Sequence, residues 1–451
     1  MSKHSGLLNL FIKYTLAAII IAVPLYPKFP FLDVPGTFVS IRLEDILLMF
    51  SGMLVIFLYL KDPRSFLKNK INLAIILFIS VGFLSYLSAI LITETVSPMI
   101  GILHWTRRIE YLVPFFLARD AIKENRSDLK FYLNIIIIVT LYIFVYGLGQ
   151  KYFHWPIIIT QNEEYSKGIA LRWLSGSHIN STFAGHYDLA TYLVLILPLL
   201  IGFFFSIKNK YKKIVLLMTS FCSLWLLVNT ASRISLVSYL VAVSLTLVIL
   251  KKYKTIPVVI IISMMFIGFS SNLISRYGRI FQVLEQRFNQ TNYNIQPRNA
   301  YAVEESVIPK RNVPFPTPTP LPVLEDRSTN IRINIEWPRA IRSFIKNPLL
   351  GTGYSSITLA TDNDYLRSLG EVGLLGFITF SLIFINLFNK ILVNKNWKRR
   401  LQKSELIFIA AMIGSLPGIF INAFFIDVFE ASKFAIIFWL MMGLNIGLCE
   451  D

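Results

Sequence analysis

The sequence has few charged residues and few cysteines for its length. Of its 451 residues, 16% are charged and 55% are hydrophobic, and the mean hydropathy is +0.59. A soluble globular protein carries about 25% charged residues, so this chain lacks the polar side chains that would cover a water-facing surface. The composition excludes a soluble enzyme and a disordered chain, and it predicts a protein that crosses a membrane several times.

The two cysteines, Cys222 and Cys449, exclude further classes. Both lie in or beside apolar segments, and no C-x-x-C spacing occurs. Two such residues build neither a disulfide scaffold nor a cysteine metal site. The N-terminus, apolar from Lys3 to Pro24, is similar to a signal peptide but has no A-x-A cleavage site. We therefore expect it to be retained as a first helix.

Apolar segments are what the sequence has in abundance. A bilayer-spanning helix needs about 20 mainly apolar residues, and hydropathy predicts twelve such segments. We expect an all-α, polytopic integral membrane protein with helices 1–9 in residues 1–272 and helices 10–12 in residues 366–451. The predicted spans are 8–25, 43–60, 72–93, 101–118, 131–149, 184–206, 214–229, 234–250, 255–272, 366–389, 405–423 and 431–447.

The net charge of +18 is explained by where the basic residues lie relative to the predicted spans, and it does not require a nucleic-acid partner. Every second joint between the predicted spans is rich in Lys and Arg: 61–70, 119–130, 208–213, 251–254 and 390–403. The joints 94–100 and 424–430, on the opposite side, contain neither residue. The positive-inside rule places basic joints in the cytoplasm. With twelve spans, we expect a multi-pass protein of the inner (plasma) membrane with both termini in the cytoplasm, and membrane lipids rather than nucleic acid as its partners.

Two outer segments are long, 150–183 and 273–365. In the second, Arg276 to Phe288 has the spacing of a helix on the membrane surface. Pro314 to Pro322 reads as an extended linker, and Ile331 to Leu350 regains helical character. Long structured loops commonly hold functional residues, so we predict the site here. We find no internal repeat, which disfavours an inverted-repeat transporter.

The most specific motif follows this linker. From Arg332 the chain reads RINIEWPRAIRSFIKNPLLGTGYSS, and from Thr361 it reads TDNDYLRSLGEVGLLGF. The first outer segment adds an Arg before a small-polar stretch, and TASR stands at 230–233. Together these elements, over about residues 160–380, resemble the O-antigen ligase/O-antigen polymerase family.

The resemblance implies a metal-independent membrane glycosyltransferase with a GT-C-like fold and no cofactor. Such an enzyme transfers a glycan from undecaprenyl diphosphate to a hydroxyl of a glycan or lipid acceptor on the extracytoplasmic face. Arginine binds phosphate oxygens bidentately and stabilises charge that develops on a leaving group. The resemblance assigns these roles to Arg172, Arg233 and Arg332, with Arg339 and Arg342 as weaker candidates.

The sequence departs from the family at one position. Ligases carry a His that is proposed to activate the acceptor, and here Asp362 takes its place, followed by Asn363. A carboxylate can act as a general base if burial raises its pKa. Polymerases of the family resemble this D-N form more than ligases do, so we expect a polymerase. A ligase acting on lipid A-core or another acceptor, and a transporter of polysaccharide or lipid-linked substrate, are the alternatives.

Each candidate also has a structural interpretation. Arg233 can orient a helix and Arg332 can be a solvated loop charge. Asp362, Asn363 or Asp364 can cap the tenth helix, and oxygen ligands in D-N-D can bind a divalent cation, although we expect no metal.

Charged residues inside the predicted spans have two interpretations as well. Glu371 is costly within a membrane and is either functional or paired with an arginine. We expect Arg107, Arg108 and Glu110 to form an internal ion-pair cluster. His178 and His186 can replace the missing base, although a polar surface position is the simpler expectation.

Overall fold

The structure, a computed structural model, describes residues 6–27, 30–34, 40–60, 62–157, 171–172, 177–270, 274, 278, 330–357, 360–393 and 401–450. The predicted surface helix from Arg276 to Phe288, Gly278 excepted, and the linker from Pro314 to Pro322 lie outside these residues.

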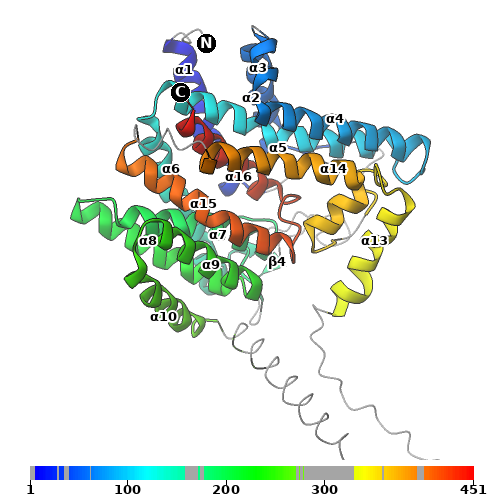
Figure 1. The fold of residues 1–451 in the computed structure, drawn as a ribbon. Coiled ribbons are helices and arrows are strands. Elements are labelled where there is room, and N and C mark those ends of the chain that lie inside the picture. Colours follow the sequence, from blue (N-terminus) through cyan, green and yellow to red (C-terminus); the bar gives the residue numbers. More distant parts are fainter. Residues whose placement is uncertain are drawn as a thin grey trace, which may run out of the picture.

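Helices dominate the described residues (Figure 1). The first half of the chain contains α1 (Gly6–Leu25), α2 (Leu43–Tyr59), α3 (Pro63–Lys68), α4 (Lys70–Leu91), α5 (Pro98–Glu124), α6 (Asp128–Phe153), α7 (His186–Phe204) and α8 (Lys210–Asn229). The second half contains α9 (Arg233–Ile249), η1 (Tyr253–Thr255), α10 (Ile256–Ile267), η2 (Arg332–Glu336), α13 (Trp337–Lys346), α14 (Asp364–Phe388), η3 (Asn389–Val393), α15 (Lys403–Ala423) and α16 (Ser432–Cys449). Two short antiparallel pairs complete the described elements, β1 (Pro30–Asp33) with β2 (Ser40–Arg42) and β3 (Pro156–Ile157) with β4 (Leu171–Arg172).

Each of the twelve predicted spans overlaps one of these helices. Within the described residues, eight helices are long and apolar enough to cross a membrane: α1, α4, α6, α7, α8, α14 with η3, α15 and α16. The helices α2, α9 and α10 are shorter, with 17, 17 and 12 residues. The fourth predicted span, in α5, is long but carries charged residues along its length. The polytopic helical class is confirmed, and the count of twelve stays a prediction.

The core forms around α16, whose 18 residues are all buried. Two G-x-x-x-G pairs explain how closely the helices pack. A side chain on Gly443 would meet the carbonyl oxygen of Phe115 in α5 at 2.2 Å, and one on Gly418 in α15 would meet that of Ser238 in α9 at 2.4 Å. Small residues allow helix backbones to approach in membranes, where no hydrophobic force drives helices together. The glycines thus allow the backbones of α16 and α5, and those of α15 and α9, to lie in close contact.

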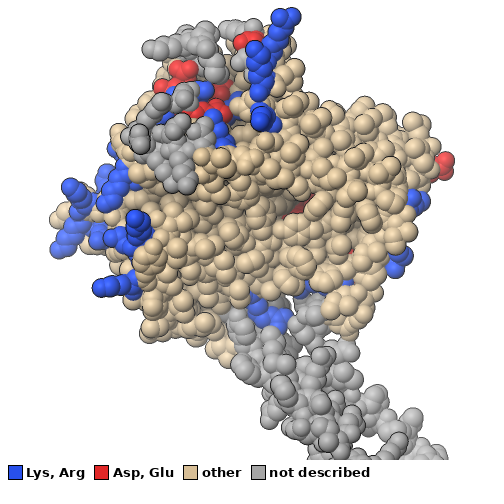
Figure 2. Space-filling view, viewed as in Figure 1, with Lys and Arg blue, Asp and Glu red and all other residues tan. Residues whose placement is uncertain are grey.

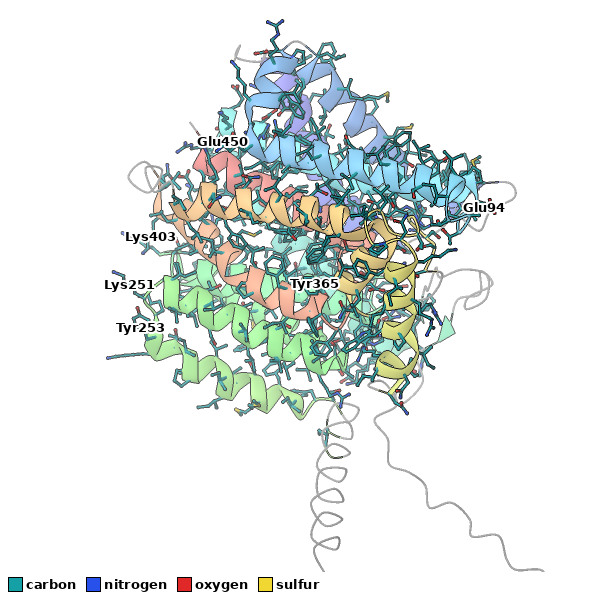
Figure 3. The ribbon with its side chains drawn as sticks, turned by 45° about the vertical axis from the view of Figure 1, so that its right-hand side comes forward. Glu94, Lys251, Tyr253, Tyr365, Lys403 and Glu450 are labelled. Atoms are coloured by element: carbon teal, nitrogen blue, oxygen red, sulfur yellow. The ribbon has the colours of Figure 1, made fainter. Side chains whose placement is uncertain are left out.

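Described lysines from several of the predicted basic joints lie at the same end of the helices. Figure 2 shows Lys and Arg at the left-hand edge and the top of this face, with smaller groups at its lower and right-hand edges, around a broad area of other residues. In Figure 3, Lys251 and Lys403 lie at one end of the helices and Glu94, in the joint without Lys or Arg, lies at the other. This arrangement agrees with the alternation in the sequence. Which end faces the cytoplasm stays a prediction from the positive-inside rule.

The helical backbone of α14 is interrupted at Gly373. The turn at residues 348–353, which precedes α14 in the sequence, packs against this interruption. Gly373 has φ 68° and ψ −171°, a conformation essentially restricted to glycine. The amide of Leu374 donates to the Pro348 carbonyl at 2.8 Å, and that of Gly353 donates to the Glu371 carbonyl at 2.8 Å. The PLLGTG turn therefore docks into the broken helix and fixes the segment between them.

Candidate active site

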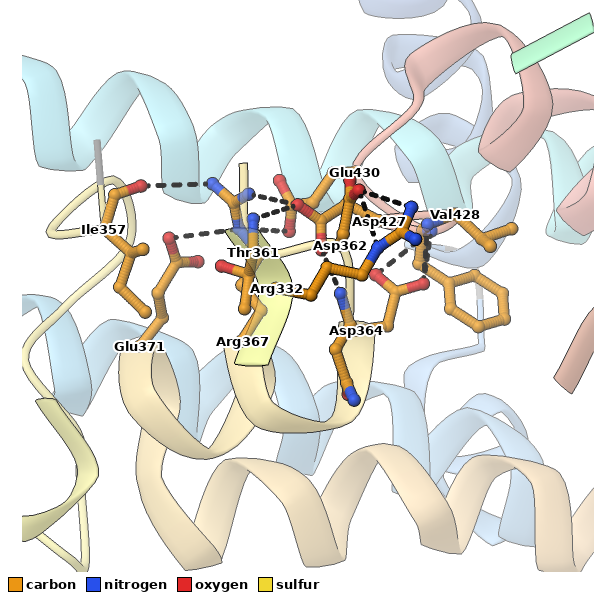
Figure 4. A network of polar contacts seen from close by, with 12 residues as sticks. Arg332, Ile357, Thr361, Asp362, Asp364, Arg367, Glu371, Asp427, Val428 and Glu430 are labelled. Carbon is orange, nitrogen blue, oxygen red and sulfur yellow. Dashed lines mark hydrogen bonds and ion pairs between the residues drawn. The ribbon is translucent and has the colours of Figure 1, made fainter. Parts of the chain in front are cut away.

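An arginine and an aspartate that the sequence analysis singled out form an ion pair in the structure (Figure 4). Nε and Nη2 of Arg332 donate to Oδ2 of Asp362 at 3.0 and 2.7 Å. Nη2 also lies 3.4 Å from the hydroxyl oxygen of Tyr187 in α7. Arg332 is buried, and burial lowers its pKa, but Asp362 and Tyr187 outweigh that effect and raise the pKa above its ordinary value. The guanidinium therefore stays charged.

The position of Asp362 is set by its backbone. Its φ of 49° is unusual for a residue other than glycine. The carboxylate of Asp427 accepts hydrogen bonds from the amides on either side, Thr361 at 2.8 Å and Asn363 at 3.1 Å. Burial raises the pKa of Asp362, and Arg332 opposes this effect. Asp427 thus holds the strained turn that presents Asp362 to Arg332.

The three residues of the D-N-D motif have separate tasks. Asn363 caps α14, because its Oδ1 accepts the amide of Leu366 at 3.0 Å. Asp364 accepts the amides of Val428 and Phe429, at 2.6 Å and 3.1 Å to Oδ2. Of the three capping interpretations, the structure therefore selects Asn363. In the part of the chain that is described, no group of three His, Cys, Asp or Glu side chains is arranged to hold a metal ion.

Glu371 pairs with an arginine, one of the two interpretations from sequence. Its Oε1 lies 3.3 Å from Nε of Arg367, one turn earlier in α14. Arg367 also contacts Asp427, with Nη1 2.8 Å from Oδ2, and Glu430, with Nε 3.7 Å from Oε1. One arginine inside the predicted membrane span thus joins carboxylates from α14 and from the α15–α16 loop. Buried charges of this kind need such partners.

Within the described residues, no ion pair joins the expected cluster of Arg107, Arg108 and Glu110 to one another; the two arginines pair instead with carboxylates of α2 and of the α15–α16 loop. Arg108 pairs with Glu430, and Nη2 of Arg107 lies 3.7 Å from Oδ2 of Asp45. Burial alone would raise the pKa of Glu430, but Arg108 and Arg367 outweigh it and hold that pKa below its ordinary value. Arg108, Glu371 and Glu430 line a cavity of about 60 Å³, large enough for a few water molecules.

Glu336, which the sequence analysis did not select, stands next to the Arg332–Asp362 pair. It ends η2 and is partly buried, and its Oε2 is buried with no hydrogen-bond partner within the described structure. Burial, then the negative charge of Asp362, raise its pKa to about 7, although Arg332 opposes them. A signal existed in the sequence: Glu336 is a carboxylate between Arg332 and Trp337, inside the most specific motif.

The two histidines that could replace the family base lie together. The rings of His178 and His186 are 4.4 Å apart, and the ring of His186 is 4.1 Å from that of Tyr187. Both histidines are half-buried, rather than on a polar surface as the simpler expectation held. Through Tyr187 they adjoin the Arg332 side of the site.

The remaining predicted site residues are less closely connected. Arg233 is the first residue of α9, behind the helix cap Ser232, whose Oγ accepts the amide of Ser235 at 3.3 Å. Arg339 lies one turn after Glu336 in α13, and its charge lowers the pKa of Glu336. Arg172 pairs with Pro156 between β4 and β3.

Comparison with known proteins identifies part of the chain. Residues 218–381 match the family model described as O-antigen ligase (Wzy_C). The comparison with curated proteins gives no match. The matched range runs from α8 into α14 and contains Arg233, Arg332, Glu336 and Asp362. The loop that supplies Asp427 and Glu430 follows it.

Proposed function

We propose, from the match of residues 218–381 to the O-antigen ligase family model, that the protein is a membrane polysaccharide polymerase. It joins undecaprenyl-diphosphate-linked oligosaccharides into a cell-surface polysaccharide. The family supports glycan transfer of the ligase or polymerase type. The polymerase form is favoured because Asp362 stands where ligases have a His.

The observation that carries the proposal is the Arg332–Asp362 pair. A buried, permanently charged guanidinium within the matched range suits the diphosphate of a lipid-linked donor. Asp362 binds two nitrogens of Arg332 through a single oxygen, so it fixes the direction of the guanidinium. Asp362 is therefore a positioning residue in this proposal. Arg233, Arg172 and Arg339 are additional diphosphate contacts, and Asn363 and Glu371 keep the first turns of α14 in place.

In the proposed reaction, an acceptor hydroxyl oxygen attacks the anomeric carbon of the donor glycan. The bond from that carbon to the diphosphate breaks, and the electron pair leaves with the diphosphate. Arg332 offsets the charge that develops there. The proton of the hydroxyl passes to a carboxylate. No metal or cofactor is required for the balance.

Glu336 is the base that the geometry favours. Its Oε2 has no hydrogen-bond partner in the described residues, whereas Oδ2 of Asp362 is already occupied by Arg332. A base works best when its pKa is near the working pH, and the pKa of Glu336 is raised to about 7. Glu336 thus supplies the carboxylate chemistry that the missing His would have supplied.

The test uses the purified full-length protein in nanodiscs with an undecaprenyl-diphosphate oligosaccharide. Products are separated on gels and weighed by mass spectrometry. We expect a ladder spaced by one repeat unit. A single transfer that appears only with an added acceptor would replace the polymerase with a ligase. Accumulation of unaltered substrate inside proteoliposomes, without covalent change, would replace both with a transporter.

A further inference from the structure

A second cavity lies at the other end of the helices that build the site. It has a volume of about 460 Å³, within the range of small-ligand pockets. It is bordered by α6, α7, α8 and the start of α15. Tyr187 at the site and Phe203 at the cavity are both in α7, 16 residues apart, which at 1.5 Å per residue is about 24 Å. The cavity is therefore separate from the proposed active site.

The cavity has two chemically different parts. Its wall is apolar, with Leu199, Leu200, Phe203 and Leu216 buried among the helices. Its mouth carries four exposed lysines: Lys130, Lys208, Lys212 and Lys403. No acidic residue lines it. Within the described structure, none of the four lysines forms an ion pair with a carboxylate.

Neighbouring lysines on the same edge differ from these four. Nζ of Lys213 lies 4.5 Å from the centre of the Phe204 ring, and Nζ of Lys252 lies 5.7 Å from that of Phe205. These two have cation–π partners. The lysines of the cavity mouth, which have no carboxylate to balance them, instead surround an opening lined by amide side chains of Asn134, Asn209 and Gln402.

We propose that this cavity binds an anionic phospholipid. Four lysines at the mouth match the negative phosphodiester of the headgroup, and the amides match its glycerol and ester oxygens. The leucine and phenylalanine wall between predicted membrane spans matches acyl chains. A basic pocket between spanning helices at the lysine-rich membrane face is a typical lipid headgroup site. A soluble phosphate would use the lysines but would leave the apolar wall unoccupied.

The test measures lipid binding to the full-length protein by native mass spectrometry after exchange into detergent. The probes are phosphatidylglycerol, phosphatidylcholine and inorganic phosphate. We expect phosphatidylglycerol to bind at least tenfold more tightly than phosphatidylcholine. Equal binding of the two lipids would overturn the proposal, and so would binding of inorganic phosphate as tight as that of phosphatidylglycerol.

Variants locate the site. The triple variant Lys130→Gln, Lys212→Gln, Lys403→Gln should lose at least tenfold in phosphatidylglycerol affinity. The control variant Lys210→Gln, Lys251→Gln, Lys254→Gln removes the same charge from the same edge, outside the cavity lining, and should keep wild-type affinity. An equal loss of phosphatidylglycerol affinity in the two triple variants would mean that the net charge of this edge, not the cavity, determines binding. That result would overturn the proposal.

A second variant tests the apolar part without changing charge. Leu133→Trp places a larger side chain at the partly buried edge of the cavity. It should weaken phosphatidylglycerol binding and leave the thermal unfolding of the lipid-free protein near that of wild type. Unchanged lipid affinity in this folded variant would contradict binding inside the cavity. All these readouts are independent of glycan transfer, so they can succeed or fail separately from the proposed function.

Discussion

At the scale of single residues, the site consists of charges that are held by other charges. Arg332 is held by Asp362, Asp362 is held through its backbone by Asp427, and Asp427 in turn contacts Arg367. This series of contacts holds the buried guanidinium of Arg332 in one orientation, as transition-state stabilisation by a preorganised group requires. The rate of glycan transfer should therefore depend more strongly on some of these residues than on others.

Replacing Arg332 should reduce glycan transfer most. Loss of one preorganised donor costs roughly 100- to 1,000-fold in rate, so we expect Arg332→Ala to lose about that much in kcat. Arg332→Lys should recover little, because an ammonium lacks the planar fork. Asp362→Asn should cost less than Arg332→Ala. Initial rates with the lipid-linked donor measure these effects.

The matched control for the arginine is Arg64→Ala, which removes an exposed guanidinium from α3. It should retain the wild-type rate. Wild-type rates in Arg332→Ala, at equal amounts of folded protein, would contradict the assigned role.

Glu336 should determine the pH dependence. A base must be deprotonated to accept the proton, and the pKa of Glu336 is raised to about 7. The rate should therefore fall as the pH decreases through 7, about tenfold for each pH unit below it. In Glu336→Gln this acidic limb should disappear and the rate at pH 8 should fall by about 100-fold, the lower end of what a general base contributes.

The control for this prediction is Glu124→Gln, at the exposed end of α5, which should keep both the rate and the profile. An acidic limb that persists unchanged in Glu336→Gln would assign the titration to another group. The alternatives would be Asp362, whose charge acts on Glu336, and the histidines His178 and His186, which the sequence analysis considered as bases.

At the scale of elements, the site depends on a broken helix. The PLLGTG turn and the E-x-G-x-x-G start of α14 contact each other through backbone hydrogen bonds. Carbon atoms added at Gly351 and Gly373 would lie 2.4 Å from the carbonyl carbon of Glu371 and 2.3 Å from the carbonyl oxygen of Leu349. These two motifs of the sequence are therefore one structural unit, with glycine where the backbones approach.

Gly373→Ala should destabilise that unit. The positive φ at Gly373 is strained for any residue with a Cβ, at about 1–3 kcal/mol, and the contact with Leu349 adds to this cost. We expect a lower apparent melting temperature and less monodisperse protein on size-exclusion chromatography. The control is Gly52→Ala, inside α2. The new carbon would lie 3.7 Å from Cγ2 of Val113 in α5, an ordinary van der Waals contact, so the melting temperature should stay that of wild type. Equal melting temperatures for the two variants would contradict the explanation.

At the scale of the whole molecule, the two ends of the helical bundle differ in the charged groups that they carry. Lysines from three joints meet around one cavity, while the Arg332–Asp362 pair lies beyond the opposite end of α7 and α15. If the lysine-rich end is cytoplasmic, as the positive-inside rule predicts, the proposed active site is extracytoplasmic. A lipid-linked donor would then be used on the outer face.

Cysteine labelling tests this orientation. In a background with Cys222→Ser and Cys449→Ser, an exposed cysteine is introduced by Ser97→Cys in one variant and by Lys254→Cys in another. A membrane-impermeant maleimide should label the first in intact cells and the second after permeabilisation. The reverse pattern would place the Arg332–Asp362 pair on the cytoplasmic side and contradict the proposed topology.

The sequence by itself determined the class, the helices and the two residues of the central pair. Apolar runs require helices in a membrane, because backbone hydrogen bonds must be satisfied internally, and all twelve predicted segments are helical. Glu371 could be chosen because a charge inside a membrane span is costly, whereas Arg332 and Asp362 were chosen from the resemblance of their motifs to the O-antigen ligase/O-antigen polymerase family. The tertiary structure decided the partners: Asp427 and Glu430 come from a distant loop, and Glu336 acquires its buried carboxylate from packing. Spacing along the chain cannot supply contacts between residues 60 to 322 positions apart, since these depend on how the helices pack.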